Sequence, residues 1–203
     1  YVRGNTWYLA QRYLFRFMQE KLNEMRIIGG LYRHRKIYWP SDKNIRPTKD
    51  RIREAIFNAL GDISNKSFLD LYSGSGAMGI EAISRNAKIS YFVDLNKNAI
   101  SCIKDNISRV NIPKEKYFVI YNNDLVAIKT FIDEEIQFDI VFLDPPYKKG
   151  EYENILNLLL QNNIISEDGI IIMESDYQLD IEIPCKKHKT YKYGKIFVNI
   201  FWR

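Results

Sequence analysis

The sequence predicts an α/β fold, in which a doubly wound, mostly parallel sheet carries helices on both of its faces. From residue 68 onward, short apolar runs of strand length alternate with segments whose apolar residues recur at helical spacing. A glycine-rich turn at residues 70–79 separates the first apolar run from the helical pattern that follows. Such alternation is typical of right-handed βαβ units, which build parallel sheets. The 203 residues, 46% of them hydrophobic, suffice for one domain with an appendage.

The elements of this sheet follow from the local patterns. We expect strands at residues 68–71, 89–93, 117–121, 138–143 and 169–174. We expect helices at residues 76–85, 96–107, 125–132 and 151–161. The alternation then ends, because Lys186–Tyr191 and Ile196–Trp202 flank the turn Tyr193-Gly194-Lys195. This arrangement predicts a closing β-hairpin.

Three segments precede the sheet. We expect residues 1–24 to form a separate helical extension, because Leu14, Met18 and Leu22 repeat at i, i+4. Residues 25–45 predict a small basic β-hairpin around Gly29-Gly30. A helix follows, for which we expect Thr48 as the N-cap and Gly61 as the terminating residue.

Positive charge is concentrated near the amino terminus. Residues 1–53 contain 13 Lys and Arg against 4 Asp and Glu, whereas residues 54–203 contain 17 against 21. This asymmetry indicates a polyanionic partner, with a solvated basic face as the alternative. In the predicted hairpin, basic and aromatic residues alternate, which suits phosphate contacts and base stacking on RNA; an ordinary edge hairpin is the alternative. The candidate RNA-binding residues are Arg26, Arg33, Arg35 and Lys36.

Cysteine and histidine are sparse. Cys102 and Cys185 form no Cys-x-x-Cys pair, and His34 and His188 show no ligand spacing, so we expect neither a disulfide nor a metal site. This usage suits a reducing compartment, and we expect a cytoplasmic location. No apolar run approaches about 18 residues, so we expect no membrane partner.

The predicted strand at residues 138–143 ends abruptly at Asp144-Pro145-Pro146-Tyr147. Proline lacks the N–H that a central strand needs, and each proline biases the preceding residue toward an extended conformation. The result is a stiff corner that holds a carboxylate, a carbonyl and an aromatic ring at the carboxyl end of a strand, where open α/β sheets bind ligands. The alternative is an ordinary strand-ending turn.

The glycine-rich turn has two interpretations. Gly74, Gly76 and Gly79 follow the pattern Gly-x-Gly-x-x-Gly, and Asp94 lies 20 residues after Gly74, which matches a dinucleotide fingerprint and an NAD-dependent oxidoreductase. Asp70, however, precedes the first glycine by four residues, where a carboxylate favours a cationic group such as a sulfonium amino acid over a pyrophosphate. No separate catalytic half follows the sheet, and the Asp144 corner has no role in hydride transfer.

Four acidic residues end predicted strands: Asp70, Asp94, Asp124 and Asp144. Because the carboxyl ends of parallel strands meet at one edge of the sheet, these side chains are expected to gather there. Asp94 is placed to hold ribose hydroxyls, and Asp124 to accept from an adenine amino group. Each could instead cap a helix.

The Asp144 corner resembles the catalytic motif of S-adenosylmethionine-dependent methyltransferases that modify exocyclic amines of adenine or guanine. The resemblance implies that Asp144 and the Pro145 carbonyl each accept an N–H bond from the target amine and leave its lone pair aimed at the methyl group. Tyr147 would stack on the base, next to a rigid Pro146. Catalysis would then depend mostly on positioning and electrostatics.

The chain from residue 25 to 203 resembles the RsmD family, bacterial methyltransferases of small-subunit (16S) ribosomal RNA that act on the N2 amine of a guanine. The motifs that carry the resemblance are Met25-Arg-Ile-Ile-Gly-Gly, residues 46–58, the Asp70 turn through Arg85, and the Asp144 corner. It implies a class I methyltransferase domain at residues 46–203, with a seven-stranded Rossmann-like sheet whose last strand is antiparallel. Residues 1–24 have no counterpart, so Met25 is a candidate native start, and Asn86 replaces a glycine.

The resemblance also implies S-adenosylmethionine as cofactor and ribosomal RNA, or the small ribosomal subunit, as partner. The candidate cofactor-binding residues are Arg46, Thr48, Asp70, Tyr72, Gly74, Gly76, Asp94, Leu95, Asp124 and Leu125. Arg46 to Thr48 would lie near the methionine end of the cofactor. The alternatives are an adenine-N6 methyltransferase of DNA or RNA, and a noncatalytic RNA-binding assembly factor. The residues themselves do not distinguish adenine from guanine.

Overall fold

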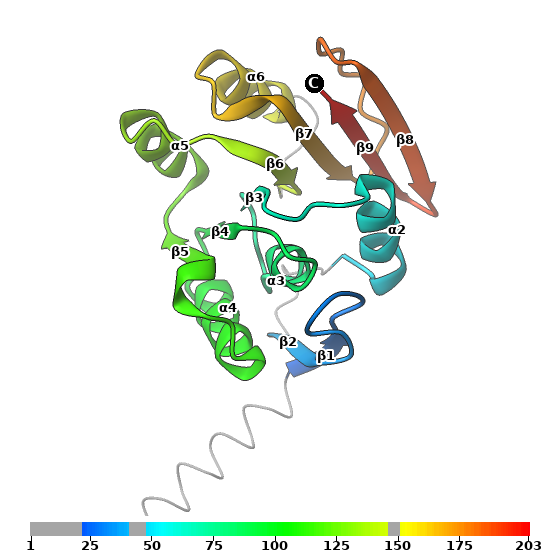
Figure 1. The fold of residues 1–203 in the computed structure, drawn as a ribbon. Helices are drawn as coiled ribbons and strands as arrows, with labels where there is room; N and C mark the ends of the chain where they lie inside the picture. The colour runs from blue at the N-terminus through cyan, green and yellow to red at the C-terminus, as the bar shows by residue number, and fades with distance from the viewer. Residues whose placement is uncertain (1–21, 41–47, 146–150) are drawn as a thin grey trace, which may run out of the picture.

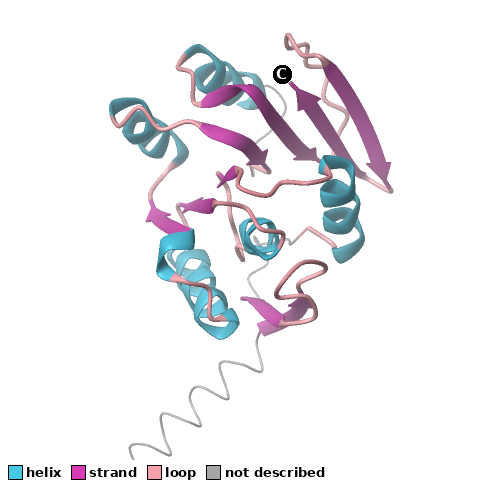
Figure 2. Ribbon diagram, viewed as in Figure 1, coloured by secondary structure: helices cyan, strands magenta, loops and turns pink. Residues whose placement is uncertain are grey.

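The computed structural model describes residues 22–40, 48–145 and 151–203. The strands are β1 (Leu22–Arg26), β2 (Lys36–Pro40), β3 (Ser67–Asp70), β4 (Ile89–Asp94), β5 (Tyr117–Tyr121), β6 (Phe138–Leu143), β7 (Ile165–Ser175), β8 (Lys187–Tyr193) and β9 (Ile196–Trp202). The helices are α2 (Asp50–Leu60), α3 (Ala77–Ser84), α4 (Lys97–Val110), the 3-10 turn η1 (Lys114–Lys116), α5 (Asp124–Asp133) and α6 (Glu151–Gln161). Figures 1 and 2 show their arrangement.

The main sheet has seven strands in the order β5-β4-β3-β6-β7-β9-β8. The pairs from β5 to β7 are parallel, and β9 is antiparallel to β7 and to β8. The strand order reverses between β3 and β6, and the crevice outside such a reversal is where open α/β sheets bind ligands. The predicted doubly wound sheet with its closing hairpin is confirmed.

Helices cover both faces of this sheet, which explains why its central strands are continuous apolar runs. On one face, Leu69 and Val141 pack in a core with the apolar sides of α5 and α6. On the other face, Phe68 and Phe142 pack with α2 and α3, and Phe92 packs with α3 and α4. Within the described residues, no helix is long and apolar enough to cross a membrane.

The predicted N-terminal hairpin forms, but it does not stand apart from the domain. Strands β1 and β2 pair antiparallel, and Met25, Ile27 and Ile37 are buried in the core that α3 and α4 build. Asn106 of α4 accepts from the Tyr38 amide at 2.9 Å and donates to the Tyr38 carbonyl at 2.7 Å. The hairpin is therefore part of the helical layer on that face of the sheet (Figure 1).

Several expected boundaries differ from the structure. Residues 22–24 belong to β1 and not to a helical extension, because they pair with residues 38–40; residues 1–21 and 41–47 lie outside the described residues. The N-cap of α2 is Lys49 and not Thr48, whose hydroxyl donates to a buried carboxylate instead. Strand β7 begins at Ile165, four residues early, with a register shift against β6. Asn86 has φ 68°, so its substitution for glycine fits a left-handed residue.

Candidate active site

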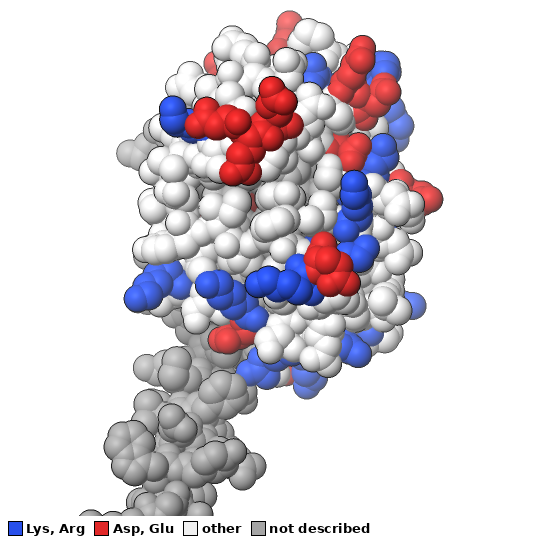
Figure 3. Space-filling view, turned by 60° about the vertical axis from the view of Figure 1, so that its left-hand side comes forward, with Lys and Arg blue, Asp and Glu red and all other residues white. Residues whose placement is uncertain are grey.

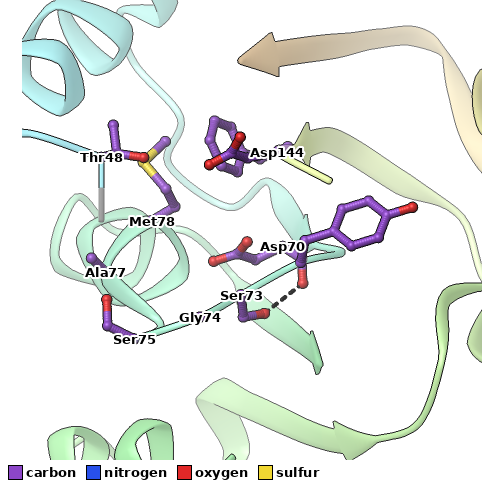
Figure 4. A pocket seen from close by; sticks show the side chains of 10 residues that line it. Thr48, Asp70, Ser73, Gly74, Ser75, Ala77, Met78 and Asp144 are labelled. Atoms are coloured by element: carbon purple, nitrogen blue, oxygen red, sulfur yellow. Dashed lines mark hydrogen bonds between the residues drawn. The ribbon is translucent and has the colours of Figure 1, made fainter. Parts of the chain in front are cut away.

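A pocket lies at the carboxyl ends of the strands, beside the reversal of strand order. It is an open pocket whose empty space, including the part continuous with solvent, is about 330 Å³. Its walls come from the loop before α2, the loop between β3 and α3, the start of α3, and the end of β6 (Figure 4). The lining residues are Thr48, Asp70, Tyr72, Ser73, Gly74, Ser75, Ala77, Met78, Phe142 and Asp144.

Asp70 is the most unusual group in the pocket. Its carboxylate is 1% exposed; Oδ2 accepts from the Gly79 amide at 3.3 Å, while Oδ1 has no hydrogen-bond partner among the described residues. Burial, together with the negative charge of Asp94, raises the pKa of Asp70 to about 7, although the Gly79 bond acts in the opposite direction. A buried carboxylate oxygen without a partner is costly, so this atom suits a cationic or N–H donor ligand.

Hydrogen bonds join the loop between β3 and α3 to the ends of the two neighbouring strands, β3 and β4. The Ser73 hydroxyl donates to the Asp70 carbonyl at 2.6 Å and accepts from the Val93 amide at 2.9 Å (Figure 4 shows the first bond). Asp94 Oδ2 accepts from the Gly74 amide at 2.8 Å. Gly76 has φ 77°, a conformation that favours glycine. These contacts pre-form the pocket wall, and they bring Asp94 directly behind the glycine-rich turn.

Asp124 lies at the start of α5, where Asn123 and not Asp124 is the N-cap. Its Oδ2 accepts from the Tyr72 hydroxyl at 2.7 Å and its Oδ1 from the Leu125 amide at 2.8 Å. Tyr72 thereby connects the pocket wall to the end of β5. Leu95 and Leu125 are 67% and 58% exposed, which leaves two apolar side chains at the solvent side of this edge.

Asp144 enters the pocket from the end of β6, and Pro145 behind it is buried. Figure 4 shows the carboxylates of Asp144 and Asp70 pointing toward the same space. The parallel pairing of Leu143 with Met173 brings Asp144 beside Glu174 at the end of β7. Burial and the negative charge of Asp144 both raise the pKa of Tyr152, whose hydroxyl donates to the Glu174 carbonyl. The carboxyl ends of β6 and β7 are therefore negatively charged where Asp144 lines the pocket.

Glu174 supports the pocket wall through Thr48 and was not among the residues predicted from the sequence. It is 6% exposed, and its Oε2 accepts from the Thr48 hydroxyl at 2.9 Å, which fixes the loop before α2 against the sheet. The signal was present, because Glu174 is an acidic residue at the end of a predicted strand, as are Asp70 and Asp144. The residues that do line the pocket and were not anticipated are Ser73, Ser75, Ala77, Met78 and Phe142.

The remaining candidates fall into two groups. Arg46, Pro146 and Tyr147 lie outside the described residues. The other group adjoins the pocket wall without lining the pocket, and it consists of Asp94, Asp124, Leu95, Leu125, Gly76 and Pro145. Among the described residues, no cluster of three or more His, Cys, Asp or Glu side chains has the arrangement of a metal site.

The candidate RNA-binding residues are on the hairpin and not in the pocket. Arg26 pairs with Asp50 at 3.4 Å, and Lys36 with Glu24 at 3.1 Å, so part of their charge is already balanced. Arg35 Nη1 donates to the Val110 carbonyl at 2.5 Å, while Arg33 is exposed at the turn.

A family model described as Conserved hypothetical protein 95 matches residues 25–202. The chain is also 36% identical, over 162 residues, to the ribosomal RNA small subunit methyltransferase D of Haemophilus influenzae; this match covers 79% of the chain and 83% of that protein. The chain belongs to the RsmD family. Its fold is accordingly that of a class I methyltransferase, with the predicted seven-stranded, mostly parallel sheet and antiparallel last strand.

Solved structures agree with this membership. That of yhhF from Escherichia coli has a TM-score of 0.74 and 28% identity, covering 89% of this RsmD-family chain and 98% of the other. SMU.776, solved in complex with SAH, has a TM-score of 0.68 at 14% identity, covering 89% of this chain and 56% of the other. The second likeness shows the fold alone.

Proposed function

We propose that this RsmD-family chain transfers a methyl group from S-adenosylmethionine to the exocyclic N2 amine of a guanine in small-subunit ribosomal RNA. The observation that carries the proposal is the pairing of two carboxylates in one pocket. Asp70 is buried and its Oδ1 has no hydrogen-bond partner within the part of the chain that the structure describes, which suits a cationic ligand, and Asp144 ends the neighbouring strand at the opposite side of that space. The name of the Haemophilus influenzae relative supports methylation of small-subunit ribosomal RNA and specifies neither the base nor the atom.

The residues at the pocket fit the proposed cofactor. S-adenosylmethionine, when bound, supplies a methyl group on a positively charged sulfur. Asp70 would accept from its cationic amino group, which removes the cost of the unpartnered oxygen. Asp94, already fixed by the Gly74 amide, has lone pairs left for ribose hydroxyls. Tyr72, Leu95, Asp124 and Leu125 are assigned to the adenine side of the cofactor. Arg46 and Thr48 are assigned to its methionine end.

Asp144 and the Pro145 carbonyl are the proposed acceptors for the two N–H groups of the target amine. The amine is a poor nucleophile because its lone pair is delocalised into the ring. Holding both hydrogens directs the lone pair toward the donor, and the Asp144 charge stabilises the amine as it becomes cationic. Pro146 would keep the corner rigid and Tyr147 would stack on the base.

The hairpin is proposed to contact RNA phosphates. Arg33 and Arg35 are exposed beside Tyr32, whose ring lies 5.3 Å from the Arg35 guanidinium. Arg26 and Lys36 would have to exchange their partners Asp50 and Glu24 for phosphate, so their contribution is expected to be smaller. A basic and aromatic surface of this kind suits RNA.

The decisive test maps the product. We would incubate the purified protein with unmodified 16S ribosomal RNA, or with small subunits that lack the modification, and with S-adenosylmethionine carrying a labelled methyl group. Mass spectrometry of nuclease digests should find the label as N2-methylguanosine at one position. Label on adenine N6 would support the alternative specificity, and RNA binding without any transfer would support a noncatalytic assembly factor. Tight NAD binding in place of S-adenosylmethionine would contradict the methyltransferase assignment.

A further inference from the structure

We infer that the RNA-binding surface proposed for the hairpin turn continues over the end of α4, η1 and the loop before β4, at the edge of the sheet opposite the active site. This inference rests on the proposed action on ribosomal RNA and extends it to a region that the proposed chemistry does not use. We call it the amino-edge surface, because it lies where the strands begin. It consists of Arg33, Arg35, Lys88, Arg109, Lys114 and Lys116.

Contacts join these residues, although they come from four different segments. The Arg35 guanidinium donates to the carbonyl of Val110, the last residue of α4, and Arg109 lies 4.9 Å over the ring of Tyr38 in the hairpin. These two contacts connect the hairpin turn to the end of α4, which leads into η1 through the buried Ile112.

The same surface continues from η1 to the loop before β4. Lys114 lies 5.8 Å over the Tyr117 ring, and Lys116 Nζ donates to the Ala87 carbonyl at 3.5 Å, next to the exposed Lys88. Figure 3 shows that Lys and Arg side chains form a band across the lower half of this face, with few acidic side chains among them. Glu115 is the acidic residue within η1 itself.

The amino-edge surface is well separated from the pocket. η1 directly precedes β5, and Lys88 directly precedes β4, whereas Asp70, Asp94 and Asp144 are at the carboxyl ends of their strands. Because β4 has six residues at about 3.3 Å each, the two edges are about 20 Å apart along that strand. Each strand of a nucleic-acid duplex carries one phosphate per about 3.4 Å of helix axis, so a duplex segment of roughly six base pairs would span both edges.

RNA is the partner that fits this surface. Its charges are Arg and Lys heads over a small region, exposed except for the half-buried Lys116, and such a cluster attracts a polyanion through counterion release. Three of these heads lie over tyrosine rings, Tyr32, Tyr38 and Tyr117, and the half-buried rings hold the cationic side chains at the surface. No groove or apolar anchor is needed, because phosphate contacts position RNA without reading its sequence.

The test compares two variants that lose the same net charge. The amino-edge variant carries Arg109→Ala, Lys114→Ala and Lys116→Ala. The control variant carries Lys189→Ala, Lys192→Ala and Lys195→Ala on the exposed C-terminal hairpin, where Lys192 also lies over an aromatic ring. We would measure binding of an unmodified 16S ribosomal RNA transcript across a range of salt concentrations, without any methyl donor, and would titrate S-adenosylhomocysteine to verify the fold of each variant.

The amino-edge variant should bind the transcript about 10- to 100-fold more weakly at 0.1 M salt, and its log–log salt slope should fall by about 2 to 3. The control variant should change the slope by less than about 1. Equal slopes in the two variants, or an unchanged amino-edge variant, would overturn the inference. Weaker binding of the amino-edge variant to the intact small subunit, with unchanged binding to the transcript, would also overturn the inference, because the surface would then contact a ribosomal protein. A wild-type protein that binds RNA but methylates none would instead refute the proposed function alone.

Discussion

The guanidinium of Arg53 and the carboxylate of Glu81 lie 3.7 Å apart, and both side chains are completely buried. Glu81 also accepts from the amides of Ile28 and Gly29, each at 2.8 Å. Arg53 Nη2 donates to the Arg26 carbonyl at 2.5 Å, and Nη1 donates to the carbonyl of Thr48 in the pocket wall at 3.4 Å. One buried ion pair therefore fixes the N-terminal hairpin and the loop beside the pocket to the same helix.

Glu81→Gln should strongly destabilise the protein. The substitution leaves the Arg53 charge buried without its main counter-charge, a loss that typically costs about 3–5 kcal/mol. Asp50→Asn is the matched control, because Asp50 pairs with the same guanidinium at 3.0 Å but is 40% exposed, and it should cost about 1 kcal/mol or less. Urea unfolding of both variants measures the difference; equal losses would show that Glu81 is not the main counter-charge.

Gly30→Ala should displace the hairpin turn from α3. Gly30 has φ 74°, and a Cβ there would lie 1.8 Å from the Ser84 carbonyl oxygen. Gly194→Ala is the control, because Gly194 has φ 65° but open space around it, so it should show only the left-handed strain of about 1 kcal/mol. We expect Gly30→Ala to lose at least about 2 kcal/mol more in thermal or urea unfolding. A loss no greater than that of Gly194→Ala would show that the turn moves away from α3 at little cost.

Cofactor binding should depend on pH through Asp70. Its pKa of about 7 in the ligand-free protein means that the carboxyl is largely protonated below pH 7 and must ionise to hold a cation. Affinity for S-adenosylhomocysteine should therefore rise about tenfold per unit between pH 5.5 and 7 and then level off. Calorimetry at each pH measures this change. In Asp70→Asn, binding should be weaker and nearly independent of pH over the same range; a retained slope would assign the titration to another group.

The same carboxyl should affect the stability of the ligand-free protein. Because burial raises the pKa of Asp70 from 3.8 to about 7, the folded state holds a proton that the unfolded state releases in this interval. The contribution of Asp70 to the free energy of unfolding is favourable below pH 3.8 and is lost as pH rises to about 7. Ligand-free Asp70→Asn should consequently be more stable than the wild type at pH 8, as judged by urea unfolding. A less stable variant would mean that the carboxylate has a favourable partner.

Asp144→Asn should slow methyl transfer by at least about 10²-fold, comparable to the loss of one preorganised electrostatic partner. The amide retains the shape of the side chain but removes the negative charge near the amine that becomes cationic. Single-turnover kinetics with saturating RNA separate this effect from RNA binding. S-adenosylhomocysteine affinity should change little, because Asp144 is assigned to the base and not to the cofactor. A near-normal rate would show that the carboxylate is structural.

The sequence alone determined the sheet and the place of the two acidic residues of the pocket, because these depend on short-range patterns. Short apolar runs such as Phe138–Leu143, alternating with helical patterns, are typical of strands covered on both faces. Asp70 ends one such strand and Asp144 follows another, so their place at one edge of the sheet followed from the parallel arrangement. Gly76 and Asn86 indicated backbone turns that their φ values confirm.

Only the tertiary structure decided the contacts between distant segments. Thr48 is a good helix cap by local preference, yet its hydroxyl donates to Glu174, 126 residues away, because the loop before α2 packs on the end of β7. Arg53 lies in a helix whose pattern gives no sign of a buried ion pair, and its partner Glu81 belongs to the helix after the glycine-rich turn. The docking of the hairpin depends on this pair and on Asn106. Local propensity contains no information about which distant polar group will satisfy a buried charge or hydroxyl, since that choice is made by packing when the layers of the fold assemble.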